Sequence, residues 1–385
     1  MESGSKNGNA DAGLRGAVVG DTRLSSINGD EGRLIYRGID IHDLARESTF
    51  EETAYLLWYG VLPSRTSLDE FRAQLSARRE LPAVIQDMLR SLPPAAAPMD
   101  VLRTAVSALA LFDDKVDDRS RSATMEKALR LTAIFPTILA AFHHIANGRE
   151  PIAPRRDLDT ASNFLYMMTG QTPSDSAARV LDVALVLHAD HGMNASTFSA
   201  IVTSATLSDM YSAITSAIGT LKGPLHGGAN EGVIHNLIEI GDLDRVAAWV
   251  DAKLAAHDKI MGFGHAVYKA YDPRATELKA LAGAVGAAAG STKWFAMTEA
   301  MERAVWERRG LYPNVDLYSA CVYHTLGIPT AYFTPVFAMS RIAGWCAHVM
   351  EQYEDNKLIR PRANYVGNRG VVYVPIDERA IDVAV

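Results

Sequence analysis

Two short stretches of the sequence place a histidine among glycines, where the backbone can come close to a ligand. "GPLHGGANEG" carries His226 and "MGFGHAVYK" carries His265. Glycine weakens helices and strands, so its density at these points needs an explanation. The segment after His226, "NEGVIHNLIEIG", predicts a helix, whose amino end favours a neutral imidazole beside an anionic ligand. On these residues alone the histidines are parts of an active site, metal ligands, or ordinary turn residues.

Charged side chains follow both histidines in the sequence. Lys269 and Arg274 come within ten residues of His265, a composition typical of a phosphate or carboxylate pocket but also of a solvated basic turn. In "YPNVDLYSACVYHTLG", Asn314 is the expected N-cap of a helix that has Asp316 in its first turn. Asp316 is therefore either a reactive carboxylate or an acid that complements the helix dipole.

Two further features suggest a ligand. "LHADHGMN" places His188 and His191 three residues apart at a helix end, either as paired ligands or as hydrogen-bonded structural histidines, and the HExxH zinc motif is absent. Arg341 is the only charge in "VFAMSRIAGWCAHV", where it shares a helix face with Phe337 and Trp345. A buried cation needs an anion, supplied by the protein or by a ligand.

Helical periodicity dominates the chain that must position these residues. Thr49 and Glu52 form a capping-box pattern, and Gly60 closes the same predicted helix. "AARVLDVALVLHAD" is apolar almost all round, which predicts a buried central helix, and Asp100 precedes another predicted helix. Strand signals are confined to "GAVVGDTRLSSING", "GRLIYRG" and, near the end, "GVVYVP". The sequence predicts an all-α, mainly helical protein with minor β-strands.

Glycine and proline mark two borders, at "LKGPLHGG" and at "LGIPT". We expect residues 1–12 to form a flexible tail. Residues 13–222 and 328–385 are predicted to form a large helical domain that carries any dimer interface, and residues 223–327 a smaller inserted helical domain. Borders of this composition suit a hinge.

Composition excludes several classes of protein. The 385 residues carry a net charge of −7, which argues against general nucleic-acid binding. The two cysteines exclude a disulfide framework and a multi-cysteine metal site. The apolar run "LTAIFPTILAAF" is too short to span a bilayer and contains Pro136. Because the first residues lack an apolar targeting segment, we expect a cytoplasmic protein with neither nucleic-acid nor membrane partners.

Taken in order, "GPLHGGAN", "GFGHAVYK…DPR" and "YPNVD" resemble the citrate synthase family. Their spacing, 39 residues from His226 to His265 and 51 more to Asp316, is similar to the family's, and the resemblance runs from about residue 13 to the end. It implies a two-domain helical fold and a homodimer whose active sites each borrow from the partner subunit. It also implies an acyltransferase of the tricarboxylic acid cycle, which condenses acetyl-CoA with oxaloacetate and releases citrate and coenzyme A. No metal and no permanently bound cofactor is implied.

The resemblance assigns a role to each of the three motif residues. Asp316 matches the base that removes a proton from the acetyl methyl group. His226 matches the donor to the thioester oxygen, and a neutral imidazole at a helix start suits this task. His265 matches the histidine that polarises the ketone of oxaloacetate and protonates the new alkoxide.

Further residues match the family's binders of substrate and of coenzyme A. Arg360 would reach the site from the other subunit, and guanidinium groups suit a dicarboxylate because they bind carboxylates through two parallel hydrogen bonds. The residues matching the substrate pocket are His191, Asn194, Arg274, Phe337, Arg341 and Arg360. Those expected to face coenzyme A are Gly262, Phe263, Gly264, Lys269 and Arg308.

Three other functions stay open. A 2-methylcitrate synthase would use propionyl-CoA on the same residues, and one methylene changes selectivity by only about 1–3 kcal/mol. A metallohydrolase built from the histidines and Asp316 is the second possibility. A non-catalytic helical scaffold is the third, although it leaves the glycine-flanked histidines and Arg341 unexplained.

Overall fold

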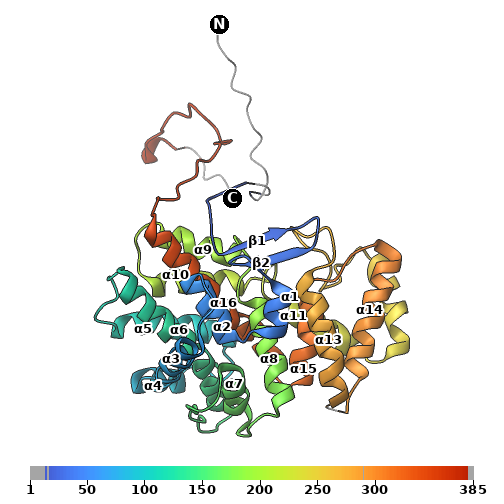
Figure 1. The fold of residues 1–385 in the computed structure, drawn as a ribbon. Helices are drawn as coiled ribbons and strands as arrows, with labels where there is room; N and C mark the ends of the chain where they lie inside the picture. Colours follow the sequence, from blue (N-terminus) through green and yellow to red (C-terminus); the bar gives the residue numbers. More distant parts are fainter. Residues whose placement is uncertain (1–13, 15–16, 289, 380–385) are drawn as a thin grey trace.

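A computed structural model describes residue 14 and residues 17–288 and 290–379 of the chain (Figure 1). The expected tail, residues 1–12, lies outside the described residues. A small antiparallel sheet covers one end of the body, with strands in the order β1-β2-β3. Its strands are β1 (Ser25–Asn28), β2 (Arg33–Tyr36) and β3 (Ile39–Asp40).

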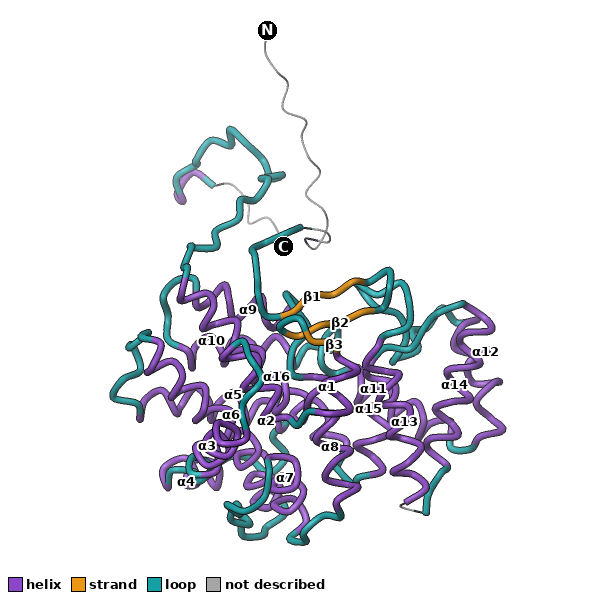
Figure 2. Tube along the Cα trace, viewed as in Figure 1, coloured by secondary structure: helices purple, strands orange, loops and turns teal. Residues whose placement is uncertain are grey.

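Helices make up almost all of the remaining regular structure (Figure 2). The helices of the first half are α1 (Ile41–Glu47), α2 (Phe50–Tyr59), α3 (Arg65–Ser76), α4 (Ala83–Ser91), α5 (Pro98–Leu109), α6 (Arg121–Ala146), α7 (Thr160–Thr169) and α8 (Asp175–His188). Those of the second half are α9 (Ala195–Ser204), α10 (Met210–Leu221), α11 (Ala229–Ile240), α12 (Val246–Ala255), α13 (Pro273–Ala288), α14 (Lys293–Arg309), α15 (Val315–Thr325) and α16 (Phe333–Glu354). The protein is therefore mainly helical, as the sequence predicts.

Two apolar helices form the centre of the body. Residues Val180–His188 of α8 are all buried, as are residues 333–350 of α16. The two helices pack against each other and against α2, so the buried helix predicted from "AARVLDVALVLHAD" is confirmed. Helices α11 to α15 gather on the right of Figure 1, beside this centre.

Helix α6 is long and apolar enough to span a membrane by length and composition. It runs through Pro136, and 83% of its most apolar window is buried inside the protein. Such burial is typical of the core helix of a soluble protein, and no other described helix meets the same criteria.

Local signals in the sequence predict several helix ends well. Thr49 and Glu52 form the expected capping box of α2, and Gly60 closes that helix with a φ of 81°. Asn314 caps α15 by accepting a hydrogen bond from the N–H of Asp316. The helix expected after Asp100 begins slightly earlier, at Pro98, because proline suits the first helical turn.

One predicted strand is wrong and another is shorter than expected. Residues 370–375, "GVVYVP", form no strand, because they lie in an exposed segment with no neighbouring strand to pair with (Figure 1). Of "GAVVGDTRLSSING", only Ser25–Asn28 is a strand. Strand β3 has two residues and carries too little pattern to be predicted.

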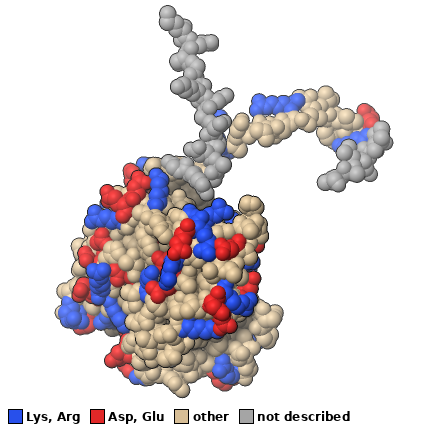
Figure 3. Space-filling model, turned by 90° about the vertical axis from the view of Figure 1, so that its right-hand side faces the viewer, with Lys and Arg blue, Asp and Glu red and all other residues tan. Residues whose placement is uncertain are grey.

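Charges of both signs are interspersed on the face shown in Figure 3. The segment after α16 stands away from the body in the same view. Its exposed apolar side chains include Val366, Val372 and Tyr373, each at least 78% exposed. Exposed apolar side chains in such number are typical of a surface that binds a partner.

Candidate active site

His226 lies in the turn that precedes α11, as predicted. A Cβ on the next residue, Gly227, would lie 2.7 Å from the carbonyl oxygen of Leu221, so only glycine allows this close turn. The His226 Nε2 atom is 2.8 Å from the Ser196 Oγ and 3.3 Å from the Ser196 backbone nitrogen. Burial, together with the charge of Arg341, lowers the pKa of His226 to about 4. The ring is therefore neutral near pH 7.

One contact of His226, with the backbone of Ser196, favours one position for the ring proton, although the Asn194 Oδ1 also lies 3.2 Å from Nε2. The backbone N–H of Ser196 can only donate, so Nε2 accepts. The Ser196 hydroxyl in turn accepts from the indole Nε1–H of Trp345. The neutral ring consequently carries its proton on Nδ1, which is available as a hydrogen-bond donor.

His265 is held by its own loop. Its Nδ1 accepts hydrogen bonds from the backbone N–H groups of Val267, at 3.0 Å, and Tyr268, at 3.1 Å. The proton of the neutral ring therefore lies on Nε2. Burial, followed by the charge of Arg274, lowers the pKa of His265 to about 4. The two neutral histidines thus present opposite nitrogens as donors.

Asp316 lies in the first turn of α15 and is 9% exposed. Its Oδ1 is buried and has no hydrogen-bond partner among the described residues. Burial raises the pKa of the Asp316 carboxyl to about 7, although Arg274 and Arg341 oppose the shift. A carboxylate of this basicity is well matched to proton abstraction near neutral pH.

Arg341 is 1% exposed, and its charge acts on both His226 and Asp316. Its Nε donates to the carbonyl oxygen of His188 at 2.6 Å, and its guanidinium lies 4.7 Å from the ring centroid of Phe337. The His188 bond is its only hydrogen bond among the described residues, so its terminal nitrogens are free for an anionic ligand. Burial lowers the pKa of Arg341 to about 10, with Asp190 opposing the shift.

Arg274 is buried, and most of its hydrogen-bond donors are already used by a neighbouring carboxylate, so they are not available to a ligand as the sequence suggests. Its Nε and Nη2 bind both carboxylate oxygens of Asp272, at 3.0 and 2.7 Å. Burial alone would lower the pKa of Arg274, but the Asp272 carboxylate raises it above its ordinary value. Among the described residues only Nη1 is left without a partner. Asp272 also accepts from the backbone N–H of Val315, which links this arginine to the start of α15.

The loop between α8 and α9 carries two further residues of the predicted pocket. His191 lies with its ring centroid 5.2 Å from that of His265, and its Nε2 is 3.2 Å from the Tyr268 hydroxyl. Burial lowers the pKa of His191 well below its usual value. Asn194 caps α9, and its Oδ1 lies 3.2 Å from Nε2 of His226.

These contacts join most of the predicted residues into one cluster. The ring of His265 contacts that of His191. Phe337 lies between Arg341 and His226, and its ring centroid is 6.3 Å from that of His226. His188, by contrast, is fully buried and its Nδ1 binds the carbonyl oxygen of Ala184. His188 is therefore a structural histidine that also supplies the carbonyl for Arg341.

Three predicted residues lie outside the cluster. Arg360 is in the exposed segment after α16 and has no hydrogen-bond partner among the described residues. Lys269 is 80% exposed and pairs with Asp30 at 2.9 Å. Arg308 pairs with Asp251 on the surface. None of these three contacts His226, His265 or Asp316 in this subunit.

Residues 262–264, which are predicted to face coenzyme A, make close backbone contacts within this chain. Gly262 has a φ of 90°, and a Cβ there would lie 2.8 Å from Val233. Phe263 forms a β-bridge with Pro313, and Gly264 donates to the carbonyl oxygen of Tyr312 at 3.0 Å. This bridge fixes the loop of His265 beside the start of α15.

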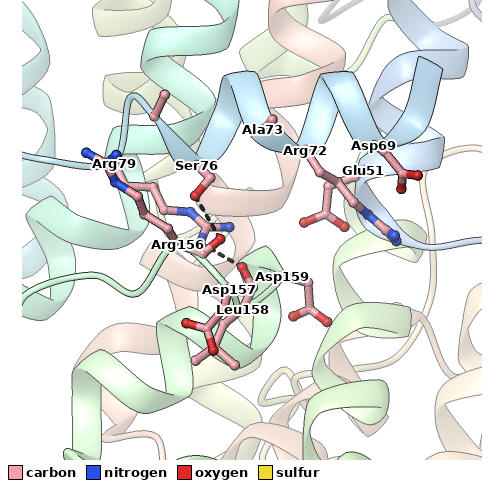
Figure 4. A pocket seen from close by; sticks show the side chains of 11 residues that line it. Glu51, Asp69, Arg72, Ala73, Ser76, Arg79, Arg156, Asp157, Leu158 and Asp159 are labelled. Carbon is pink, nitrogen blue, oxygen red and sulfur yellow. Dashed lines mark hydrogen bonds between the residues drawn. The ribbon is translucent and has the colours of Figure 1, made fainter. Parts of the chain in front are cut away.

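Metal-ligating residues do not gather in the described part of the chain: no group of three or more His, Cys, Asp or Glu side chains there is arranged to hold a metal ion. A cavity of about 630 Å³ with several charged side chains in its lining lies elsewhere, between α3 and the loop before α7 (Figure 4). Glu51 and Arg72 line it, and none of the predicted site residues does.

Sequence reasoning missed the residues that orient the cluster. Ser196, Tyr268 and Asp272 each contact a predicted residue through a hydrogen bond. Asp272 lies two residues before Arg274, a spacing that signals a local ion pair. Ser196 has no such signal, because its contact with His226 spans 30 residues.

Comparisons with known proteins identify relatives of the whole chain. Residues 13–362 match the family model described as citrate synthase, C-terminal domain. The citrate synthase of Haloferax volcanii is 49% identical over 97% of this chain and its own full length. The 2-methylcitrate synthase of Shewanella oneidensis is 41% identical over 96% of this chain and 98% of its own.

A solved structure extends the likeness to the fold. The citrate synthase of Thermoplasma acidophilum, solved as a ternary complex with carboxymethyl coenzyme A and oxaloacetate, is 33% identical. It superposes with a TM-score of 0.89 over 96% of this chain and 99% of its own. Sequence, fold and the ordered cluster of histidines, arginines and aspartate lead to one conclusion: the chain belongs to the citrate synthase family.

Proposed function

We propose that this protein condenses acetyl-CoA with oxaloacetate and hydrolyses the product to citrate and coenzyme A. It would act as an acyltransferase of the tricarboxylic acid cycle in the cytoplasm. The observation that carries the proposal is the buried Asp316, with a pKa of about 7, which shares the charges of Arg341 with His226 and of Arg274 with His265. A base and two hydrogen-bond donors are what an enolate-forming condensation requires.

In the first step, ionised Asp316 removes a proton from the methyl carbon of the acetyl group. The electron pair moves onto the thioester oxygen, which accepts a hydrogen bond from Nδ1–H of His226. This donor is oriented in advance because Ser196 holds the opposite nitrogen. Preorganised donors stabilise developing charge without reorganisation during the reaction.

In the second step, the enolate carbon attacks the ketone carbon of oxaloacetate. Nε2–H of His265 polarises the ketone oxygen and gives its proton to the resulting alkoxide. Water then attacks the thioester carbon, the C–S bond breaks, and the thiol of coenzyme A leaves with a proton. The proton that Asp316 took from the methyl group then returns through water to Nε2 of His265, and the carboxyl proton left by hydrolysis goes to solvent. All three side chains therefore end the cycle in their starting protonation states.

The carboxylates of oxaloacetate would bind at Arg341, Arg274 and His191. Arg341 offers its terminal nitrogens, because Nε alone is engaged by the His188 carbonyl oxygen. Arg274 contributes through Nη1, since Asp272 occupies its other two nitrogens. Phe337 and Asn194 would complete the pocket wall.

We propose a homodimer in which Arg360 completes the partner's site. Support comes from the segment after α16, which carries Arg360 and exposed apolar side chains away from its own body (Figure 3). Lys269, Arg308 and the loop Gly262–Gly264 are proposed to face coenzyme A. The ion pairs of Lys269 and Arg308 are exposed and therefore weak enough to exchange for phosphate.

The proposed domains, residues 13–222 with 328–385 and residues 223–327, would close around the substrate. Arg341 and Arg274 belong to different domains in this division, so one dicarboxylate can bridge them. Closure would exclude water during enolate formation. Small-angle scattering with and without oxaloacetate tests this, and identical profiles would refute closure.

A 2-methylcitrate synthase is the second candidate, because relatives with that name are 41–42% identical to this chain. The values of kcat/KM for acetyl-CoA and propionyl-CoA, measured with oxaloacetate, distinguish the two. A higher value for propionyl-CoA would identify 2-methylcitrate, and not citrate, as the physiological product.

The metallohydrolase alternative has its own test. The proposal expects CoA release to require oxaloacetate and to be unchanged by EDTA. Activity that EDTA abolishes and zinc restores would overturn the condensation mechanism. CoA release that is unchanged in both Asp316→Ala and His265→Ala would leave a non-catalytic helical protein as the better description.

A further inference from the structure

The turn that joins β1 to β2, residues 29–32, lies directly against the loop that carries His265. The carbonyl oxygen of Gly29 accepts hydrogen bonds from the backbone N–H groups of Lys269, at 2.9 Å, and Ala270, at 3.4 Å. The ion pair between Asp30 and Lys269 joins two exposed side chains and contributes little. Backbone contacts therefore make this junction.

Glycine is required at both ends of the turn because the two backbones touch. A Cβ on Gly29 would lie 2.2 Å from the carbonyl oxygen of Val267. A Cβ on Gly32 would lie 2.6 Å from the carbonyl oxygen of Tyr271. Neither neighbour is the end of a flexible side chain, so any larger residue must displace the turn or the loop.

The loop divides its N–H groups between His265 and the turn. The N–H groups of Val267 and Tyr268 bind Nδ1 of the imidazole, and those of the next two residues bind the Gly29 carbonyl oxygen. The short segment is thus fixed on one side by the ring and on the other by the turn. Val267 takes part in both contacts, since its carbonyl oxygen packs against Gly29 and its N–H holds the ring.

We propose that the turn Gly29–Gly32 is a positioning element for His265. It holds the loop at the distance at which Nε2–H points to the ketone oxygen of oxaloacetate. Asn28 shapes the turn, because its Oδ1 accepts from the N–H groups of Asp30 and Glu31. The proposal rests on the function proposed above, and it assigns a catalytic consequence to two glycines distant in sequence from all three motifs.

The chain supplies matched controls for an alanine test. Gly38, with a φ of 88°, has no atom within 4 Å of an added Cβ, so Gly38→Ala reproduces the backbone strain of Gly32→Ala without the contact. Gly20 likewise has no atom within 4 Å, and Gly20→Ala serves as the control for Gly29→Ala. Asn28→Ala is a milder variant, because this exposed side chain can be lost without creating a clash.

We expect Gly29→Ala and Gly32→Ala to lower kcat/KM for oxaloacetate by about 100-fold, since small misplacements of a catalytic group have effects of this size. The kcat/KM of the two control variants should stay close to that of the wild type, and the value for Asn28→Ala should lie between those of the controls and of the two glycine variants. The carbonyl stretching frequency of bound oxaloacetate should shift back toward its value in water, because a displaced His265 polarises the ketone less. A turn that only stabilises the fold would leave this frequency unchanged.

Hydrogen exchange provides a readout that does not depend on turnover. The amides of Lys269 and Ala270 should exchange faster in Gly29→Ala than in Gly20→Ala. The two variants are compared at the same interval below their own melting temperatures, so that global unfolding contributes equally. Should both glycine variants match their controls in kcat/KM and in carbonyl frequency, the proposal is overturned. A wild-type protein without condensing activity refutes the proposed function instead, while the exchange data still decide whether the turn holds the loop.

Discussion

At the residue scale, the central feature is a pair of neutral histidines that donate from opposite nitrogens. Their positions in the sequence could be predicted from glycine spacing, and their family resemblance suggested roles. Their tautomers could not be predicted, because these depend on Ser196 for His226 and on Val267 and Tyr268 for His265. The contact of His226 with Ser196 spans 30 residues and leaves no local pattern, and the contacts of His265 depend on how its own loop bends, which the residue types there do not specify.

The first prediction concerns the hydroxyl that lies against His226. Ser196→Ala removes Oγ but keeps the backbone N–H that binds Nε2, so the tautomer is retained while the ring is held less firmly. We expect kcat to fall by about tenfold, as for the loss of one oriented hydrogen bond worth about 1–2 kcal/mol. The KM for oxaloacetate should change little, and steady-state kinetics measures both.

Ser204→Ala is the matched control for this change. Ser204 is buried on the same helix, α9, and the one hydrogen bond of its hydroxyl within the described part of the chain goes to the carbonyl oxygen of Ile201. An equal fall of kcat in both variants would mean that packing of α9, rather than orientation of His226, is responsible.

The second prediction is a pH dependence set by Asp316. Its pKa is raised to about 7, and only the ionised form can accept a proton. The value of kcat/KM should therefore be constant above about pH 7 and fall by up to tenfold per unit below it. Both histidines stay neutral down to about pH 4, so they do not contribute to this limb. A pH profile of the wild type that shows no acid limb between 6 and 8, a window of about one unit around that pKa, would contradict the assignment.

At the element scale, capped helices bring distant residues to one place. Caps could be predicted where the signal is local, as for Thr49 with Glu52 and for Asn314. The strand expected at residues 370–375 shows the limit of such signals. Its apolar, β-branched residues fit a strand, but pairing depends on a neighbour that the sequence pattern does not specify.

The third prediction separates helix stability from site geometry. Asn314→Ala removes the N-cap of α15 and should lower the free energy of unfolding by about 1 kcal/mol. It should also reduce kcat, because Asp316 lies in the first turn of α15 and its own backbone N–H donates to the side chain of Asn314. Ser174→Ala removes the cap of α8, at the end distant from His188.

Chemical denaturation and kinetics distinguish the two caps. Both variants should lose similar stability, whereas only Asn314→Ala should lose activity. Full activity in Asn314→Ala, despite the lost stability, would show that the cap does not position Asp316.

At the scale of the whole molecule, we propose that a second subunit completes the site. Arg360 lies in a segment that stands away from its own body, so this subunit alone does not bring it to the cluster (Figure 1). A shared site is what the resemblance to the family implies. No periodicity or spacing within one chain could have done so, because the contact would be intermolecular.

The fourth prediction uses two inactive variants together. Asp316→Ala and Arg360→Ala homodimers should each have little activity. A heterodimer would contain one site with Asp316 from one subunit and Arg360 from the other, and one site lacking both. Random mixing of subunits should therefore restore about a quarter of the wild-type activity. Co-expression with two affinity tags measures this. No recovery in the doubly tagged dimer would place Arg360 in its own subunit's site, and a fully active Arg360→Ala homodimer would place it outside any site.

The most direct test of the whole account is oxaloacetate-dependent release of coenzyme A from acetyl-CoA, with the product identified by NMR. The account predicts citrate formation by the wild type in the presence of EDTA, and a fall of about 100-fold or more in Asp316→Asn, which keeps the side-chain shape but cannot act as a base. CoA release without oxaloacetate, or undiminished citrate formation by Asp316→Asn, would contradict it.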